Sequence, residues 1–243
     1  MVFGLPAALD FPDIAAVYAR FAALTVESVD LGGTLLLYSG LDRDGIAVAM
    51  ASNVAGAASL GIEPDAERAK QAVRAGVCDF LVNNLDEALR ILKNEIRKRR
   101  AVSVVLTGDV DSMVTAIVAR GVQPEVLTFP VRELVERGAR MLAADVEDTR
   151  AAVTWSVANE PMRWLPVVDA LASASLEIAD ARVRWIEGSS RYLGRAFEGQ
   201  RFLHMTNEEA DAFAFAIRAA VTVGTIPCAV SVTLGGEATS IER

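Results

Sequence analysis

The chain has 243 residues, 52% of them hydrophobic, and a formal net charge of −8. This length allows one large domain or two modest ones, and this composition can bury a full core without disulfide bonds or a metal ion. The acidic balance argues against a general nucleic-acid binder, because neutralising phosphates requires clustered Lys and Arg. We also expect no membrane span, since charged residues interrupt every apolar run before it reaches ~18 residues.

The two cysteines and the single histidine limit the thiol and metal chemistry that the chain can support. Cys78 and Cys228 are far apart, and the first residues lack a basic signal region, so we expect a reduced, cytoplasmic protein. Cys78 is predicted to lie in the core, whereas Cys228 is either a core residue or a reactive thiol. His204 alone cannot build a His-rich metal site, so no metal is predicted. The mean hydropathy of +0.31 predicts Ala- and Val-rich buried strands and an interface in a homo-oligomer such as a homodimer.

The first half of the chain alternates between apolar runs and helical periodicity. Residues 6–30 are predicted to form a helical lead-in that ends before Gly32 and Gly33. Strands are then predicted at 34–38, 57–62, 77–82, 102–106 and 125–129, and helices at 45–56, 65–75, 85–98 and 112–120. Continuous apolar strands with short links to helices predict an α/β fold, a doubly wound, Rossmann-like parallel sheet of about five strands.

The pattern loosens after Pro130. We predict helices at 131–144 and 161–179, strands at 151–157, 182–186 and 230–234, and a helix that Thr206 opens with Glu209 in a capping box. The expected organisation is a lead-in over 1–30, a Rossmann-like domain over 31–130, and a mixed α/β or helical segment over 131–243. This last segment packs on the first domain or serves dimerisation.

Gly40 and Gly45 flank the turn after the first predicted strand. In dinucleotide-binding folds, glycines at this turn let backbone N–H groups reach a pyrophosphate at the start of a helix. The turn here contains Leu-Asp-Arg-Asp and no GxGxxG pattern. Asp42 and Asp44 would repel a phosphate, and Arg43 would offset part of that repulsion. The alternative interpretation is a plain strand-to-helix turn.

Two further positions fall at the carboxyl ends of predicted strands. Glu63 follows the glycine turn by about 20 residues, where an acidic residue binds a ribose hydroxyl, and Arg68 lies five residues later. The alternative is a surface ion pair between these two residues, which contributes little. Gly108 and Asp109 end the fourth strand at the edge where ligands bind in such sheets, or they form only a turn.

These residues resemble the NAD-binding Rossmann-like domain of urocanase (urocanate hydratase) over about Phe21 to Thr128. Leu31-Gly32-Gly33 and the apolar strand 35–38 are similar to the start of that domain. Glu63 and Arg68 fall where the family has its NAD-contacting Glu and Arg. The segments 85–89 (Leu-Asp-Glu-Ala-Leu), 102–109 and 120–126 also resemble family segments, with Asp109 in place of an NAD-contacting Asn. The resemblance implies NAD as the candidate cofactor, with Gly40, Gly45, Glu63, Arg68, Gly108 and Asp109 as cofactor-binding residues.

The departures from the family argue against its activity. The family's glycine-rich loop is replaced by Asp-Arg-Asp, and its Gln-Thr-Ser-Ala-His-Asp segment by residues 129–133. Neither cysteine has the surroundings of the family's active-site cysteine, and the family chain is more than twice as long. The resemblance therefore predicts a truncated, divergent relative.

We predict a urocanase-like protein that has kept the Rossmann-like domain, has lost hydratase activity, and binds a nucleotide or another small ligand. No catalytic residue is assigned. One alternative is an active NAD-dependent lyase or oxidoreductase that uses Arg191, Tyr192, His204 or Cys228. A second alternative is a non-catalytic subunit or interaction module.

Overall fold

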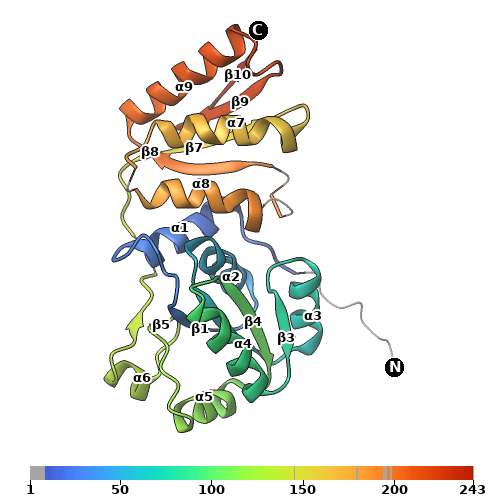
Figure 1. Cartoon of the computed structure of the whole chain (residues 1–243), viewed down its shortest axis with the longest axis vertical. Coiled ribbons are helices and arrows are strands. Elements are labelled where there is room, and N and C mark those ends of the chain that lie inside the picture. The colour runs from blue at the N-terminus through green and yellow to red at the C-terminus, as the bar shows by residue number, and fades with distance from the viewer. Residues whose placement is uncertain (1–8, 145, 179, 194–195, 198, 243) are drawn as a thin grey trace. The chain divides into compact units, whose positions relative to one another are not determined.

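The computed structural model describes residues 9–144, 146–178, 180–193, 196–197 and 199–242. The chain forms two compact units, residues 1–145 and 146–243. The first unit combines parallel strands with flanking helices, and the second combines helices with an antiparallel sheet (Figure 1). No helix among the described residues is both long enough and apolar enough to cross a membrane.

The first unit is built on a six-stranded parallel sheet with the order β3-β4-β2-β1-β5-β6. Strands β1 and β2 are direct neighbours, with Leu37 opposite Leu60. The predicted α/β, Rossmann-like class is confirmed, with one strand more than expected. The strands are β1 (Leu35–Ser39), β2 (Ala58–Glu63), β3 (Phe80–Val82), β4 (Val102–Thr107), β5 (Val126–Leu127) and β6 (Arg140–Met141).

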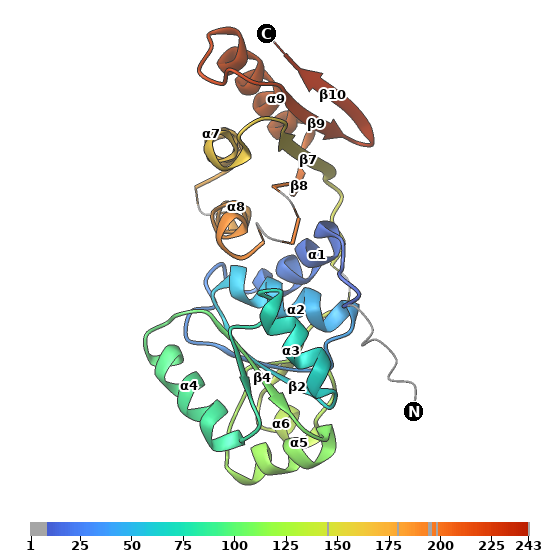
Figure 2. The same cartoon turned by 90° about the vertical axis from the view of Figure 1, so that its right-hand side faces the viewer.

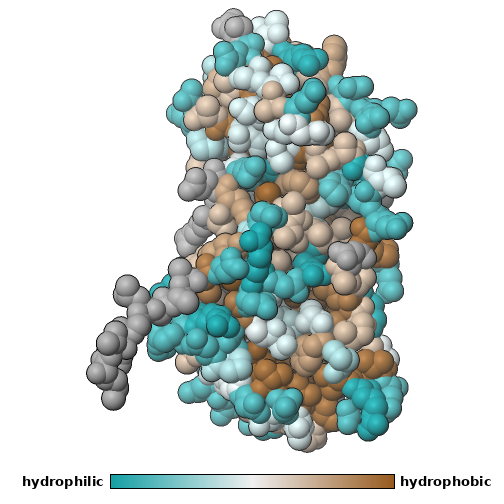
Figure 3. Space-filling view, turned by 180° about the vertical axis from the view of Figure 1, so that it is seen from behind, coloured by the Kyte–Doolittle hydropathy of each residue, from teal (hydrophilic) through white to brown (hydrophobic). Residues whose placement is uncertain are grey.

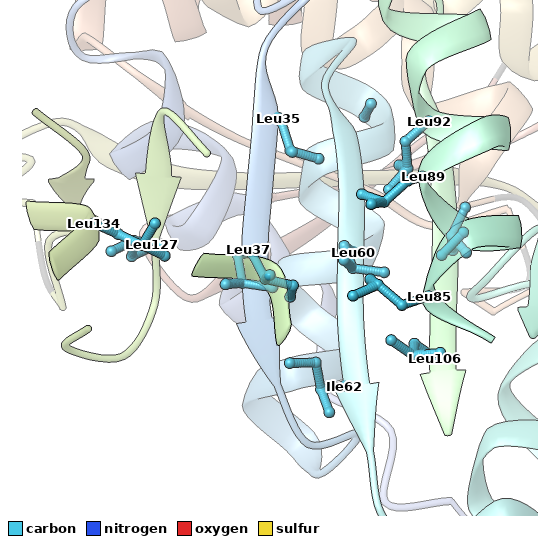
Figure 4. Packing of buried hydrophobic residues seen from close by; sticks show 14 of the residues in the cluster. Leu35, Leu37, Leu60, Ile62, Leu85, Leu89, Leu92, Leu106, Leu127 and Leu134 are labelled. Carbon is cyan, nitrogen blue, oxygen red and sulfur yellow. The ribbon is translucent and has the colours of Figure 1, made fainter. Parts of the chain in front are cut away.

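Helices cover both faces of this sheet. The helices of the unit are α1 (Ile14–Thr25), α2 (Arg43–Ala55), α3 (Ala66–Arg74), α4 (Leu85–Arg97), α5 (Val110–Ala119) and α6 (Arg132–Glu136). On one face, Leu37, Leu60 and Leu106 of the strands form an apolar cluster with Leu85 of α4 and Leu134 of α6 (Figure 4). The continuous apolar strands of the sequence are thus buried on both sides, as the parallel arrangement requires.

Helix α2 lies on the opposite face, between the sheet and α1. It contacts β1, β2 and β4 but contributes no residue to the cluster on the first face, and its outer side packs on α1. Every residue from Gly45 to Ala55 is buried. The Ala-rich composition of this helix explains the arrangement, because small side chains allow close approach on two sides at once.

The second unit is a four-stranded antiparallel sheet with the order β10-β9-β7-β8. Figure 2 shows α7 and α8 end-on, on the same side of the strands. Buried Val153, Trp155 and Val157 alternate along β7 with more exposed residues, so one face of the sheet carries the core. The elements are β7 (Ala151–Val157), α7 (Pro161–Ala174), α8 (Ala181–Tyr192), β8 (Arg201–Met205), α9 (Asn207–Thr222), β9 (Val230–Leu234) and β10 (Glu237–Ile241).

Two predictions for the second half of the chain are wrong. Residues 182–186 form the first part of α8 and not a strand, because Arg182, Trp185, Ile186 and Ser189 are buried at helical spacing. The helix predicted over 131–144 is only α6, and the chain then turns at Gly138 (φ 103°) into the sixth parallel strand. The capping box at Thr206 and Glu209 is confirmed.

Hydrophobic residues also reach the surface of the first unit. Phe80, Val135 and Met141 are each 41–47% exposed. Figure 3 shows one face of the molecule, on which brown, hydrophobic residues gather toward the lower end among teal, hydrophilic ones. The high mean hydropathy therefore reflects surface composition as well as the buried strands.

Candidate functional site

The predicted site positions of the first unit lie on three neighbouring strands. Gly40 follows β1, Glu63 ends β2 and Gly108 follows β4, and these strands are adjacent in the sheet. The Gly40 N–H donates to the Ile62 carbonyl at 2.8 Å, and the Gly108 N–H donates to the Glu63 carbonyl at 3.2 Å. The sequence thus brings these positions to the carboxyl edge of the sheet, where ligands bind in open α/β folds.

Glu63 has a role within the fold that the sequence did not indicate. The residue is 1% exposed. Its Oε2 accepts a hydrogen bond from the Leu41 N–H at 2.7 Å, and its Oε1 accepts one from the Asp65 N–H at 2.8 Å. One carboxylate therefore fixes both the β1–α2 loop and the β2–α3 loop. In this arrangement neither oxygen is turned to solvent to receive a ribose hydroxyl.

The predicted partner of Glu63 is close but differently placed. Arg68 Nη1 lies 3.7 Å from Glu63 Oε2, and the arginine side chain is 45% exposed. The predicted pair of Glu63 and Arg68 is present, but it is not a surface pair, because only the arginine is at the surface. The guanidinium of Arg68 is nevertheless a cation at the rim of the carboxyl edge.

Asp42 occupies the position at which a dinucleotide fold receives phosphate. It is the N-cap of α2, and its Oδ1 accepts a hydrogen bond from the Gly45 N–H at 2.9 Å. The N-terminus of a helix favours an anion because its first N–H groups have no partner within the helix. At α2 the protein supplies that anion from its own chain.

The next helices of the edge are capped in the same way. Asp65 accepts from the Glu67 and Arg68 N–H groups at the start of α3, and Asp109 accepts from the Ser112 N–H at the start of α5. The Ser112 hydroxyl also donates to Asp109, and these bonds lower the pKa of the Asp109 carboxyl. Asn84 caps α4. Side-chain oxygens therefore occupy successive anion-binding helix ends along one edge.

The charged neighbours of the turn are held by α1 and the segment before it. Asp44 pairs with Arg20 at 2.6 Å, and Arg43 pairs with Asp13 at 3.0 Å. Both pairs are at least partly exposed, so each contributes little to stability. Arg43 is therefore turned toward carboxylates of the chain itself.

The two glycines of the turn serve different purposes. Gly40 has a φ of 77°, the left-handed region that favours glycine, and a side chain there would meet nothing within 4 Å. At Gly45, a Cβ atom would lie 2.1 Å from the Gly40 carbonyl oxygen. Gly45 is thus required for the close packing of α2 on the turn, whether or not a ligand binds there.

The residues considered for catalysis in the second unit do not form one site. His204 on β8 lies opposite Ala152 near the start of β7, whereas Cys228 precedes Val230, which lies opposite Val157 at its end. Five residues of strand separate these ends by about 17 Å. Burial raises the pKa of the Cys228 thiol, which opposes thiolate formation. Cys78 is buried in the first unit, as expected.

Arg191 and Tyr192 contact each other, with the guanidinium carbon 5.0 Å from the ring centre. Both belong to the last turn of α8. This cation–π contact is a packing arrangement that surface side chains commonly form.

The second unit contains buried ion pairs that sequence reasoning missed. Arg201 Nε donates to Asp169 Oδ2 at 3.0 Å, and the Trp155 indole N–H donates to Asp169 Oδ1 at 2.9 Å. Arg182 is held by Glu209 at 2.7 Å and by Asp180. These partners lie 2 to 32 residues apart, so only the pair of Asp180 and Arg182 leaves a local signal in the sequence.

A third charged group lies at the start of the second unit. His204 Nδ1 is 2.8 Å from Asp148 Oδ2, and Arg150 Nε donates to Asp148 Oδ1 at 2.7 Å. Partial burial opposes ionisation of Asp148, yet the hydrogen bonds from Arg150 and His204 hold the pKa of this carboxyl well below its usual range. His204 is thus one member of a charged cluster.

A cavity of about 370 Å³ lies at the other edge of the parallel sheet. Its lining includes Thr34, Glu125 and Arg140, which stand at the amino ends of β1, β5 and β6, together with Glu27. Arg140 already contacts Glu27 at 3.5 Å and donates to the Leu24 carbonyl at 3.0 Å. Among the described residues, no group of three His, Cys, Asp or Glu is arranged to hold a metal ion.

Comparison with known families gives one match to the first unit. Residues 15–129 match the family model described as the urocanase Rossmann-like domain. The matched range begins in α1 and ends just after β5, so it contains the sheet edge described above. The resemblance of this part of the chain to the urocanase Rossmann-like domain is therefore confirmed.

Proposed function

We propose that the urocanase Rossmann-like domain of this chain binds a small ligand at its carboxyl edge but does not hold NAD and does not support urocanate hydration. The observation that carries this proposal is the Asp42 carboxylate on the N-terminus of α2. A pyrophosphate would have to displace that carboxylate and would then lie beside a like charge.

The fit of NAD to this edge is poor at a second position. Glu63, at the place where the family resemblance implies a cofactor contact, is 1% exposed, and each of its two oxygens accepts a hydrogen bond from a loop N–H group. Turning the carboxylate toward a ribose would leave those N–H groups without partners, which costs about 1–3 kcal/mol for each buried group. The residues present therefore do not suit the cofactor.

The charge of the edge indicates the class of ligand. Asp42, Asp65 and Asp109 place carboxylates along it, and Asp109 has a lowered pKa that keeps it ionised. An uncharged or cationic small molecule, such as a nucleoside without phosphate, avoids the repulsion that a nucleotide meets. We propose a ligand of this class.

Calorimetric titration tests the proposal. NAD, ADP-ribose and adenosine are titrated into the full chain, and we expect no saturable heat from the two pyrophosphate compounds. Asp42→Asn keeps a capping oxygen but removes the charge, so it should strengthen any residual NAD binding. Asp111→Asn, in the first turn of α5, is the control for a general change of charge. A sub-micromolar dissociation constant for NAD would overturn the proposal.

A second candidate, an NAD-dependent lyase or oxidoreductase, is favoured by one observation. Arg68 remains half-exposed at the edge and 3.7 Å from Glu63, the pair that the resemblance assigns to cofactor contact. Loss of urocanate absorbance on mixing with the protein, or turnover in a hydratase and dehydrogenase screen, would support it. Unchanged turnover in Arg68→Ala would count against it.

We also propose that the protein is cytoplasmic. Neither Cys78 nor Cys228 is in a disulfide bond. Free thiols suit a reducing environment such as the cytoplasm. Quantitative thiol labelling of the protein in intact cells tests this, and reversible oxidation of both thiols there would contradict it.

A further inference from the structure

Helix α9 exposes a face that contains hydrophobic and charged residues together. Phe215 is 73% exposed and Val223, at its C-terminal end, is 76% exposed. The opposite side of the helix is buried through Phe213, Ala214, Ile217 and other residues. At 3.6 residues per turn, one exposed strip centres on Phe215. Its members, all exposed, are Glu208, Asp211, Ala212, Phe215, Arg218, Ala219, Thr222 and Val223.

The strip divides into two flanks. Ala212, Ala219 and Val223 lie on one side of Phe215, and Asp211 and Arg218 lie on the other, about 40° and 60° around the helix. Among the described residues, neither Asp211 nor Arg218 forms an ion pair or a side-chain hydrogen bond. The helix thus presents an apolar flank next to an unpaired acid and an unpaired base.

The spacing of these two charges makes the strip complementary to itself. Asp211 lies about 6 Å before Phe215 along the helix axis, and Arg218 lies about 4.5 Å after it. A two-fold axis that pairs two such helices antiparallel places each flank beside the same flank of the partner helix. It also reverses the direction of the partner helix. Asp211 of each copy then lies level with Arg218 of the other copy, so two such pairs form. Ala212 of each copy likewise lies level with Ala219 of the other.

We propose that α9 is a docking surface for a second copy of this chain, paired antiparallel about a two-fold axis at Phe215. Two reciprocal Asp211–Arg218 ion pairs flank the two Phe215 rings, and the small alanines let the helices approach closely. A symmetric interface of this kind is isologous, with the same residues used on both sides. A helix of 16 residues is about 24 Å long, so the contact is below the standard interface size and the dimer is weak and concentration-dependent.

Sedimentation equilibrium on the full chain, with two charge reversals, tests this geometry. Asp211→Arg places Arg opposite Arg in its own dimer, and Arg218→Asp places Asp opposite Asp, so each should raise the dimer dissociation constant at least about tenfold. An equal mixture of the two variants restores both opposite-charge pairs, and we expect a heterodimer with about the wild-type dissociation constant. Simple loss of a contact would not be rescued by mixing.

Two further variants complete the test. Phe215→Ala should also raise the dissociation constant about tenfold or more, because it removes the central apolar contact. Glu187→Arg, at an exposed position of α8 outside the strip, should leave it unchanged. Thermal melting of each variant confirms folding, since all these positions are at the surface. A wild-type chain that stays monomeric at a few hundred micromolar, or a mixture that does not re-associate, would overturn the proposal.

Discussion

The two units treat buried charge in opposite ways. In the first, the buried carboxylate of Glu63 is satisfied by backbone N–H groups of two loops. In the second, the buried carboxylate of Asp169 is satisfied by the guanidinium of Arg201, and Arg182 is similarly surrounded by carboxylates. A charge held by backbone groups shapes a loop, whereas a charge held by another charge ties distant elements together. The first arrangement therefore fixes loops at the carboxyl edge of the parallel sheet, and the second links elements in the core of the second unit.

Breaking the buried pair of the second unit should have the largest effect. Asp169→Ala leaves the Arg201 guanidinium buried, 4% exposed, and without its carboxylate. We expect a loss of about 3–5 kcal/mol in the free energy of unfolding, measured by urea titration. The double variant Asp169→Leu with Arg201→Met removes both charges and should be much closer to wild type. A loss below about 1 kcal/mol for the single variant would contradict this account.

The equivalent change in the first unit should lower the free energy of unfolding by a smaller amount. Glu63→Ala removes one side chain but leaves two N–H groups without partners, and loop N–H groups near an edge can reach water. We expect a loss of about 2–4 kcal/mol in the free energy of unfolding. Glu63→Gln keeps one acceptor oxygen and should cost about half as much. Equal losses for the two variants would show that the carboxylate is not the link between the loops.

The Asp148 cluster gives a pH-dependent, smaller effect. The pKa of Asp148 is lower in the folded state than its usual value, so the stabilisation is present above pH ~4 and declines as pH falls through the folded pKa. The melting temperature of wild type should therefore fall more steeply below pH 4 than that of Asp148→Asn. Because the carboxyl is partly solvated, the difference will be modest and is best measured by parallel melting curves between pH 2 and 7. If the melting temperatures of wild type and Asp148→Asn fell equally with pH below pH 4, the prediction would be contradicted.

The cap of α2 should give the smallest change in stability. Asp42→Ala removes the acceptor for the Gly45 N–H, which typically costs about 1 kcal/mol. Asp42→Asn keeps the acceptor and should cost almost nothing. Urea titration measures the free energy of unfolding of both variants. This measurement separates the capping effect of Asp42 from its electrostatic effect on ligand binding, which calorimetry of Asp42→Asn tests. A larger loss for Asn than for Ala would mean that the side chain does not act as a cap.

Prediction from sequence was most successful where local patterns decide structure. The apolar strands predicted at 34–38 and 57–62 lie at 35–39 and 58–63, and the capping box at Thr206 and Glu209 was expected from capping rules. The prediction of a strand at 182–186 failed because Val183, Trp185 and Ile186 allow a strand as well as a helix over so short a window. Burial of residues at helical spacing decided in favour of the helix. The two-residue strand β6 has no pattern of its own and exists only because β5 is beside it.

The sequence by itself determined the alternation of strand and helix, the residues at the carboxyl edge, and the urocanase-like character of residues 15–129. Only the tertiary structure decided what those edge residues do: Glu63 points inward to two loops, and Asp42 points at the N-terminus of its own helix. It also decided that Asp169 meets Arg201 and that Phe215 faces outward. The physical reason is that periodicity and caps are local, whereas the partner of a buried charge is set by packing between segments far apart in the chain.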